Sequence, residues 1–363
     1  MENEILEMIS AVLPPDEEAM ARALARQSKL AKPPHSLGRL EDISVKVAGM
    51  TGRLFNRADR RRVLVFASDN GICEEGVASA PQSVTLAQTI NISRGMTGEG
   101  TLAKHFHCET EVIDLGVKTD FSCPTVRCEK IAYGTKNFAK EHAMTRGQAL
   151  RALRIGYGAA LRAKADGVEI LGIGEMGIGN TSTSSAVLCA LTGLTAEDTV
   201  SRGGGVNDEG FRRKKQVIDE ALAKWRPDPN DPVDALTKVG GFDLCGMTGA
   251  FLGAAAARIP VVIDGYISVV AALCAARLCP NAKAYMLSSH ASTERGYAMA
   301  TRELGLEPIL LLGMHLGEGS GCPIAFEIVS AALDVLENMA TFEEAAIQDD
   351  YLDEIRAEKR YQE

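Results

Sequence analysis

Short apolar runs alternate along the chain with longer stretches of helical spacing. Six apolar runs are typical of buried strands and lie at 63–67, 111–115, 169–173, 260–263, 284–287 and 309–312. Alanine-rich stretches between them have helical spacing, such as 146–166 after the cap residue Thr145 and 209–225 after Asp208. This alternation predicts an α/β protein with a doubly wound, mostly parallel, six-stranded Rossmann-like sheet covered by helices on both faces.

Both ends of the chain lack a strand pattern. The first 55 residues predict a helix at about 17–30, a break at Lys32-Pro33-Pro34 and a second helix from Leu37, and another helix is expected at about 322–339. We expect residues 1–55 and 325–363 to pack together as a small helical domain beside a large α/β catalytic domain at 56–324.

Composition narrows the class of protein. The 363 residues are 46% hydrophobic and 24% charged, as in globular proteins, and contain no apolar run of about 18 residues that could span a membrane. The formal charge of −9 argues against nucleic acid as a partner. The acidic start and nine cysteines without a Cys-x-x-Cys pair favour a cytoplasmic location with reduced thiols. Together with 35 glycines, these features favour an enzyme acting on small molecules.

The glycine-rich stretch at 172–181 follows an expected strand and precedes the Ser/Thr-rich start of a helix. Its pattern matches both the dinucleotide fingerprint Gly172-x-Gly174-x-x-Gly177 and a P-loop that ends in Asn180-Thr181. The P-loop match lacks the lysine that contacts the β and γ phosphates. The dinucleotide match would place Glu175 beside a pyrophosphate, which weakens the alternative of an NAD-dependent oxidoreductase.

A site for a single phosphate is the better interpretation of this stretch, because glycine N–H groups and a helix N-terminus both attract an anion. A purely structural turn and a noncatalytic nucleotide-binding protein stay open as alternatives. A second glycine loop, Gly203-Gly204-Gly205, precedes the helix at 209–225, and Lys214 lies about two turns into that helix. Lys214 either completes a phosphate clamp or belongs to a solvated charged face at 212–215.

Glu318 is a lone carboxylate in the glycine-rich segment Leu316-Gly317-Glu318-Gly319-Ser320-Gly321. A carboxylate in an apolar pocket has its pKa raised towards neutrality, where it can act as a general base. The alternative role is stabilisation of the N-terminus of the helix that follows.

Other polar residues lie at expected strand ends, where open α/β sheets bind ligands. They are Asp69, Asp264 and the segment Ser289-His290-Ala291-Ser292. The chain shows little sign of a metal site, because His105-x-His107-Cys108 precedes a strand, and no Gly-x-Ser-x-Gly nucleophile elbow occurs. We expect neither a metal nor a cofactor.

Seven segments spread over nearly the whole chain carry a more specific signal: Lys32-Pro33-Pro34-His35-Ser36-Leu37-Gly38-Arg39-Leu40-Glu41, Glu75-Gly76-Val77, Gly174-Glu175-Met176-Gly177-Ile178-Gly179-Asn180-Thr181, Gly240-Gly241-Phe242-Asp243-Leu244, Gly246-Met247-Thr248-Gly249, Asp264-Gly265 and Leu316-Gly317-Glu318-Gly319-Ser320-Gly321. Together they resemble the nicotinate-nucleotide:dimethylbenzimidazole phosphoribosyltransferases of cobalamin nucleotide-loop assembly. The resemblance implies transfer of phosphoribose from nicotinate mononucleotide to a benzimidazole nitrogen, giving an α-ribazole 5′-phosphate and nicotinate.

The resemblance also implies residue roles and a homodimer whose active site is bordered by the neighbouring subunit. Glu318 is then the general base, and the acceptor ring lies near Gln88 and Ala80. The implied contacts to the rest of the nucleotide, including its phosphate, are Glu175, Gly177, Asn180, Thr181, Gly203, Gly205, Lys214, Asp264 and Ser292.

Two positions depart from the family's pattern. His35 and Asn70 stand where the family has glycine and histidine. The choice of acceptor is left open, because relatives use adenine or phenols such as p-cresol, and some work with a paralogous partner chain.

Overall fold

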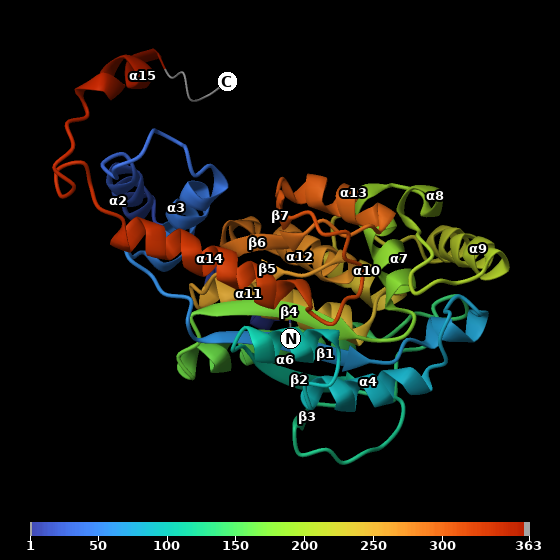
Figure 1. The fold of residues 1–363 in the computed structure, drawn as a ribbon. Helices are drawn as coiled ribbons and strands as arrows, with labels where there is room; N and C mark the ends of the chain where they lie inside the picture. The colour runs from blue at the N-terminus through green and yellow to red at the C-terminus, as the bar shows by residue number, and fades with distance from the viewer. Residues whose placement is uncertain (1, 359–363) are drawn as a thin grey trace.

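A computed structural model of the chain describes residues 2–358. Its centre is one sheet in which all neighbouring strands are parallel, in the order β3-β2-β1-β4-β5-β6-β7 (Figure 1). The strands are β1 (Arg61–Ser68), β2 (Glu109–Gly116), β3 (Val126–Cys128), β4 (Ile170–Met176), β5 (Val261–Ile263), β6 (Met286–His290) and β7 (Pro308–Leu310). The predicted α/β class and parallel sheet are confirmed.

The prediction of six strands is wrong by one, because β3 was missed. This strand has only three residues, of which Val126 is buried while Arg127 and Cys128 are exposed. An edge strand so short and so polar leaves no apolar run in the sequence.

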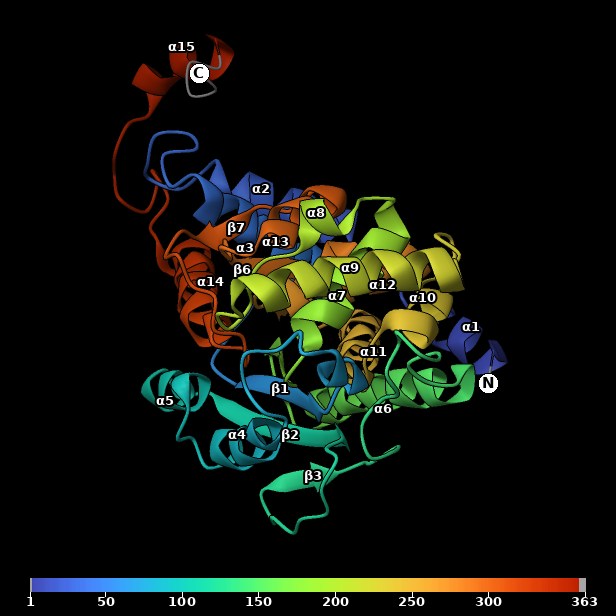
Figure 2. The same cartoon turned by 90° about the vertical axis from the view of Figure 1, so that its right-hand side faces the viewer.

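Helices cover both faces of the sheet. Figure 2 shows α5 and α14 on one side of the strands, with α6 and α11 on the other. The helices are α1 (Glu2–Ser10), α2 (Glu17–Gln27), α3 (Arg39–Thr51), α4 (Ser83–Ser93), α5 (Gly98–His105), α6 (Arg146–Ala165), α7 (Asn180–Thr192), α8 (Ala196–Thr199), α9 (Asp208–Trp225), α10 (Pro232–Val239), α11 (Phe242–Ala256), α12 (Tyr266–Leu278), α13 (Arg295–Leu304), α14 (Gly321–Asn338) and α15 (Asp353–Glu358). None of the helices among residues 2–358 combines the length and the apolar character that crossing a membrane requires.

Local sequence signals explain where the predicted helices begin. Thr145 forms a capping box with Gln148 at the start of α6, as expected from its position. The cap of α9 is Asn207, whose side chain accepts a hydrogen bond from the Gly210 N–H, so this helix begins one residue earlier than predicted.

The terminal helices pack together, as Figure 1 shows for α2, α3 and α14. Small apolar side chains fill the contact: Ala19, Ala23, Val45, Ala48 and Leu336 form one buried cluster. The expected helices near both ends are therefore present. The division into domains at 1–55 plus 325–363 and at 56–324 stays a prediction.

Strand β4 extends further than its apolar run suggests and includes Gly172 and Gly174. A Cβ at Gly172 would lie 2.5 Å from the Cys322 Cβ, and one at Gly174 would lie 2.6 Å from the Glu318 carbonyl carbon. These two glycines let α14 and the 316–321 segment lie directly on the strand. The dinucleotide interpretation of Gly172-x-Gly174-x-x-Gly177 is therefore wrong, because the turn begins only at Gly177.

Candidate active site

A cavity of about 310 Å³ opens at the carboxyl ends of β4, β5 and β6. Ten of the residues predicted to bind substrate or catalyse line it: Ala80, Gln88, Glu175, Gly177, Asn180, Thr181, Gly203, Asp264, Ser292 and Glu318. Two predicted residues are not part of the lining. Lys214 lies behind Thr181, and Gly205 lies one residue beyond the lining residue Gly204.

Glu318 reaches the cavity from an unusual backbone turn. Gly317, Glu318 and Gly319 all have positive φ angles, of 87°, 64° and 89°. Gly319 also packs so closely that a Cβ there would lie 2.6 Å from the Val63 Cγ1. Three left-handed residues in succession turn the Glu318 side chain away from α14, and only 5% of its surface remains exposed.

The Glu318 carboxylate is held by donors from two helices on the far side of the cavity. The Gln88 Nε2 of α4 donates to Oε1 over 3.4 Å, and the Glu99 backbone N–H in the first turn of α5 donates to Oε2 over 3.2 Å. The Glu318 carboxylate thus lies against the first turn of α5. Glu318 therefore interacts with α5 rather than with the first turn of α14, contrary to the alternative role.

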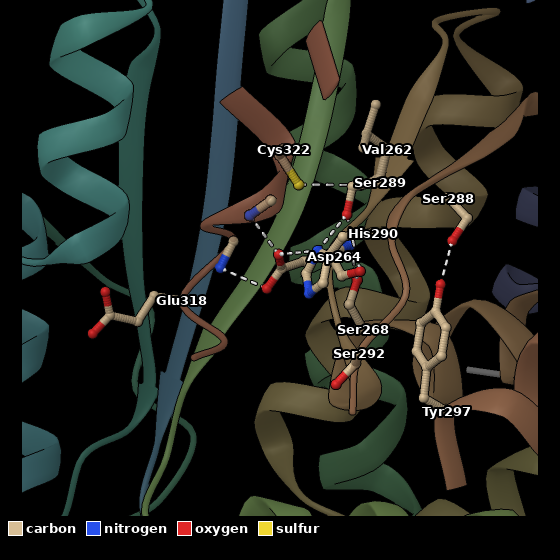
Figure 3. Close-up of polar contacts among 12 residues, drawn as sticks. Val262, Asp264, Ser268, Ser288, Ser289, His290, Ser292, Tyr297, Glu318 and Cys322 are labelled. Atoms are coloured by element: carbon tan, nitrogen blue, oxygen red, sulfur yellow. Dashed lines mark hydrogen bonds and ion pairs between the residues drawn. The ribbon is translucent and has the colours of Figure 1, made fainter. Parts of the chain in front are cut away.

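Asp264 fixes the loop that carries Glu318. Its Oδ2 accepts the Gly319 N–H over 3.0 Å and its Oδ1 accepts the Gly321 N–H over 2.7 Å. Figure 3 shows both bonds, with the Glu318 carboxylate pointing away from Asp264. Burial raises the pKa of Asp264, while nearby His290 and the backbone N–H groups lower it. Asp264 lines the cavity, yet both of its carboxylate oxygens are used to hold the loop.

Glu175 lies at the end of β4 and joins two predicted segments. Its Oε2 accepts a hydrogen bond from the Asn180 side chain, and its Oε1 accepts the Glu318 backbone N–H over 3.4 Å. Burial, and next to it the negative charge of Asp243, raise the pKa of Glu175 to about 8. The Glu175 carboxyl is therefore mainly protonated at neutral pH.

Lys214 is only 1% exposed, so it does not belong to a solvated face, although its neighbour Arg212 is exposed. Its Nζ donates to the Thr181 Oγ1 over 2.7 Å, and burial lowers its pKa to about 8. Gly203 has a φ of 56°, and a Cβ there would lie 3.7 Å from this Nζ. A buried cation thus lies beneath the glycine-lined end of the cavity, where an anion would bind.

Comparisons with known proteins match this arrangement. A phosphoribosyltransferase family model matches residues 12–347. The nicotinate-nucleotide–dimethylbenzimidazole phosphoribosyltransferase of Clostridium perfringens is 50% identical over 361 residues, 99% of each chain. The chain belongs to this phosphoribosyltransferase family. The protein of the same name from Clostridium tetani is 43% identical over 96% of this chain and 97% of its own.

A solved relative supports the same conclusion. The crystal structure of the Thermus thermophilus enzyme of that name has a TM-score of 0.87 and 38% identity, and covers 92% of this chain and 99% of its own. The chain is thus an enzyme that transfers phosphoribose, and an NAD-dependent oxidoreductase is not favoured.

Sequence reasoning missed two acidic residues of this candidate site. Glu99 is fully buried and binds Glu318 through its backbone, and Glu294 lines the cavity with a buried Oε2 that has no hydrogen-bond partner among the described residues. A signal for Glu99 existed, because Gly98-Glu99-Gly100 repeats the Gly-Glu-Gly pattern around Glu318. Within residues 2–358 no three His, Cys, Asp or Glu side chains form a group that could bind a metal ion.

Proposed function

We propose that this enzyme transfers phosphoribose from nicotinate mononucleotide to 5,6-dimethylbenzimidazole or a related lower-ligand base. The products are α-ribazole 5′-phosphate, used for the nucleotide loop of cobamides, and nicotinate. The proposal rests mainly on one observation. The Glu318 carboxylate, which Gln88 and Glu99 hold by hydrogen bonds, lines the same cavity as the glycine turns. Beneath those turns lies the buried cation Lys214.

The phosphate would bind at the end of the cavity near Lys214. The cap of α7 is Gly179, which has no side chain that could crowd an anion at the start of the helix. The Asn180 and Ser182 N–H groups already donate to the carbonyl oxygens of Gly177 and Gly179, so the attraction for an anion comes mainly from the partial positive charge of the helix start. Thr181 and Gly203 line the same end. This placement leaves C1′ of the ribose directed towards the part of the cavity that contains Glu318.

A single base suffices for the reaction. Nicotinate leaves from a pyridinium, so the bond between C1′ and the pyridinium nitrogen breaks with its electron pair going to that nitrogen, without an acid. The benzimidazole nitrogen bonds to C1′ from the opposite face and inverts it, and Glu318 takes the N–H proton. Donors from α4 and α5 hold the carboxylate, so little reorganisation is needed when the acceptor binds.

The test is an assay with nicotinate mononucleotide and dimethylbenzimidazole, followed by the mass of the product. Glu318→Gln should lower kcat about a hundredfold or more with little change in the Kd for nicotinate mononucleotide. The surface variant Glu303→Gln serves as a control and should keep full activity. Absence of product with the wild-type enzyme, or near-normal turnover by Glu318→Gln at neutral pH, would contradict the proposal.

The apolar wall formed by Val77, Ala80 and Val84 suits an aromatic acceptor. A competition assay that offers dimethylbenzimidazole, adenine and p-cresol together measures which base is used. We expect the benzimidazole nucleotide to be the main product. A dominant adenine or cresol product would reassign the acceptor and leave phosphoribose transfer in place.

We further propose a homodimer in the cytoplasm. Three leucines in the segment that precedes Glu318 are strongly exposed, with Leu311, Leu312 and Leu316 at 82%, 58% and 58%, and Leu316 also lines the cavity. Covering such a cluster with a second copy would remove apolar surface from water. Light scattering at assay concentration tests the dimer, and a fully active monomer would refute it.

A further inference from the structure

His290 is a cavity residue with one nitrogen unused. It lies at the carboxyl end of β6, is fully buried and lines the active-site cavity. Its Nδ1 lies 3.0 Å from the Ser289 Oγ, whereas its buried Nε2 has no partner among the described residues. Figure 3 shows the ring beside Asp264. A buried polar atom without a partner is costly, so a ligand atom in the cavity is its natural partner.

The neighbours of His290 determine which nitrogen carries the hydrogen. The Ser289 hydroxyl has one hydrogen, which it donates to the Asp264 carbonyl oxygen over 3.1 Å. Its Oγ must therefore accept a hydrogen bond from His290 Nδ1–H. The Asp264 carboxylate, 3.8 Å from Nδ1, favours the same arrangement. In the neutral imidazole, Nε2 is then a buried hydrogen-bond acceptor on a residue that lines the cavity.

One glycine packs tightly against this ring. A Cβ at Gly321 would lie 2.2 Å from Nδ1, whereas one at Gly265 would lie at an ordinary contact distance of 3.6 Å from Nε2. The backbone at Gly321 and the Ser289 contact therefore restrict how the ring can turn before any ligand binds.

The chemistry of the substrates identifies the donor, in an inference that rests on the proposed function. In nicotinate mononucleotide the carboxylate and phosphate accept hydrogen bonds, and the pyridinium has no N–H. The N–H of the acceptor base is used by Glu318. The two ribose hydroxyls are the donors that remain. We propose that His290 Nε2 accepts a hydrogen bond from one ribose hydroxyl and so selects ribosyl over deoxyribosyl substrates.

A second observation agrees with a diol ligand. Glu294 Oε2 is another buried acceptor without a partner among the described residues, and Glu294 lines the same cavity. Two residues of the cavity lining thus each hold a buried acceptor without a partner among the described residues, which matches a sugar with two hydroxyls.

The experiment measures the Kd of nicotinate mononucleotide and of its 2′-deoxy and 3′-deoxy analogues by calorimetry, without an acceptor base. Binding is measured rather than turnover because loss of the 2′-hydroxyl changes the intrinsic reactivity of C1′. The variants are His290→Asn, whose amide can replace Nδ1 but has no atom at Nε2, and His290→Gln, whose amide oxygen can replace the Nε2 acceptor. Thermal unfolding checks that both variants fold.

We expect the wild type to bind one analogue about tenfold to a hundredfold more weakly than the ribonucleotide. In His290→Asn this difference in Kd between the analogue and the ribonucleotide should fall to about threefold or less. In His290→Gln the difference in Kd should be restored in part. Equal binding of all three ligands by the wild type would overturn the inference without any variant. An undiminished difference in His290→Asn would also overturn it. Failure of the wild type to bind nicotinate mononucleotide at all would instead refute the proposed function.

Discussion

The substitution Asp264→Asn tests how the site is held together. The Asp264 side chain is 2% exposed, and its two oxygens accept the N–H groups of Gly319 and Gly321 over 3.0 and 2.7 Å. Asparagine keeps the size of the side chain but replaces one oxygen with an NH₂ group. A donor then faces a backbone donor, and the negative charge is lost from the remaining bond.

The expected cost follows from these contacts. A hydrogen bond to a charged group contributes about 1.5–3 kcal/mol, and a buried N–H left without a partner costs about 1–3 kcal/mol. Part of this is offset, because the neutral amide avoids the desolvation that raises the pKa of Asp264. We expect a net loss of about 3 kcal/mol in the free energy of unfolding. Since Glu318 adjoins Gly319, a displacement of ~1 Å should also lower kcat about a hundredfold.

The assay is urea unfolding together with steady-state turnover. Ser288→Ala is the control, because the Ser288 Oγ in the neighbouring strand β6 pairs with the Tyr297 hydroxyl of α13 over 2.8 Å and does not touch the Glu318 loop (Figure 3). It should cost about 1 kcal/mol and leave kcat unchanged. The reasoning is refuted if Asp264→Asn is no less stable than Ser288→Ala and keeps kcat within threefold of the wild type.

Three further predictions follow from the site. Lys214→Ala should weaken binding of nicotinate mononucleotide at least tenfold more than binding of nicotinate riboside, measured by calorimetry, and equal losses would exclude a phosphate contact. Burial raises the pKa of Glu175 from 4.5 to about 8, so its contribution to stability is complete below pH 4.5 and is lost as the pH rises to 8. Glu175→Gln should flatten this decline by up to about 1.4 kcal/mol per pH unit in urea unfolding, and an unchanged slope would contradict the assignment. Gly174→Ala should cost about 1–3 kcal/mol and most of the activity, because its Cβ would lie 2.5 Å from the Gly319 nitrogen, whereas Gly158→Ala in α6, with no neighbour closer than 3.5 Å, should be tolerated.

The sheet could be predicted from sequence because buried parallel strands are continuously apolar. Each of the six predicted runs overlaps a strand, and the missed strand β3 is the one in which a single apolar residue is followed by two exposed residues, Arg127 and Cys128. Strand ends were harder to locate. Gly174 lies beyond the apolar run at 169–173 and suggested a turn, but it is part of β4, because a residue without a side chain serves close packing as well as it serves a turn.

That the candidate residues gather in one cavity could also be predicted, because the carboxyl ends of parallel strands meet at one edge of a sheet. The sequence around Lys214 did not distinguish a solvated charged face from a phosphate-binding lysine. The difference depends on whether other segments bury the Lys214 side chain, which the local sequence does not indicate. Glu99 was missed for a similar reason. Its backbone N–H becomes functional only when the start of α5 meets the Glu318 loop, a contact between residues 219 positions apart.

The backbone conformation of Glu318 is unfavourable for a residue with a Cβ, so the stability of variants at this position can show why glutamate is present. Its φ of 64° lies in the left-handed region, which costs a residue with a Cβ about 1–2 kcal/mol. Glu318→Gly and Glu318→Ala both remove the carboxylate and should both abolish turnover, but only glycine relieves the backbone. Glycine should therefore be the more stable variant by about 0.5–1 kcal/mol in urea unfolding, the reverse of the usual order. His35, at a φ of 55° where the family has glycine, provides the comparison, because His35→Gly should likewise exceed His35→Ala in stability. An alanine variant as stable as glycine at position 318 would mean that the turn relaxes without the carboxylate. If the glycine variant is more stable than the alanine variant at both positions 318 and 35, the backbone at both positions suits glycine. Glutamate is then retained at 318 for its chemistry.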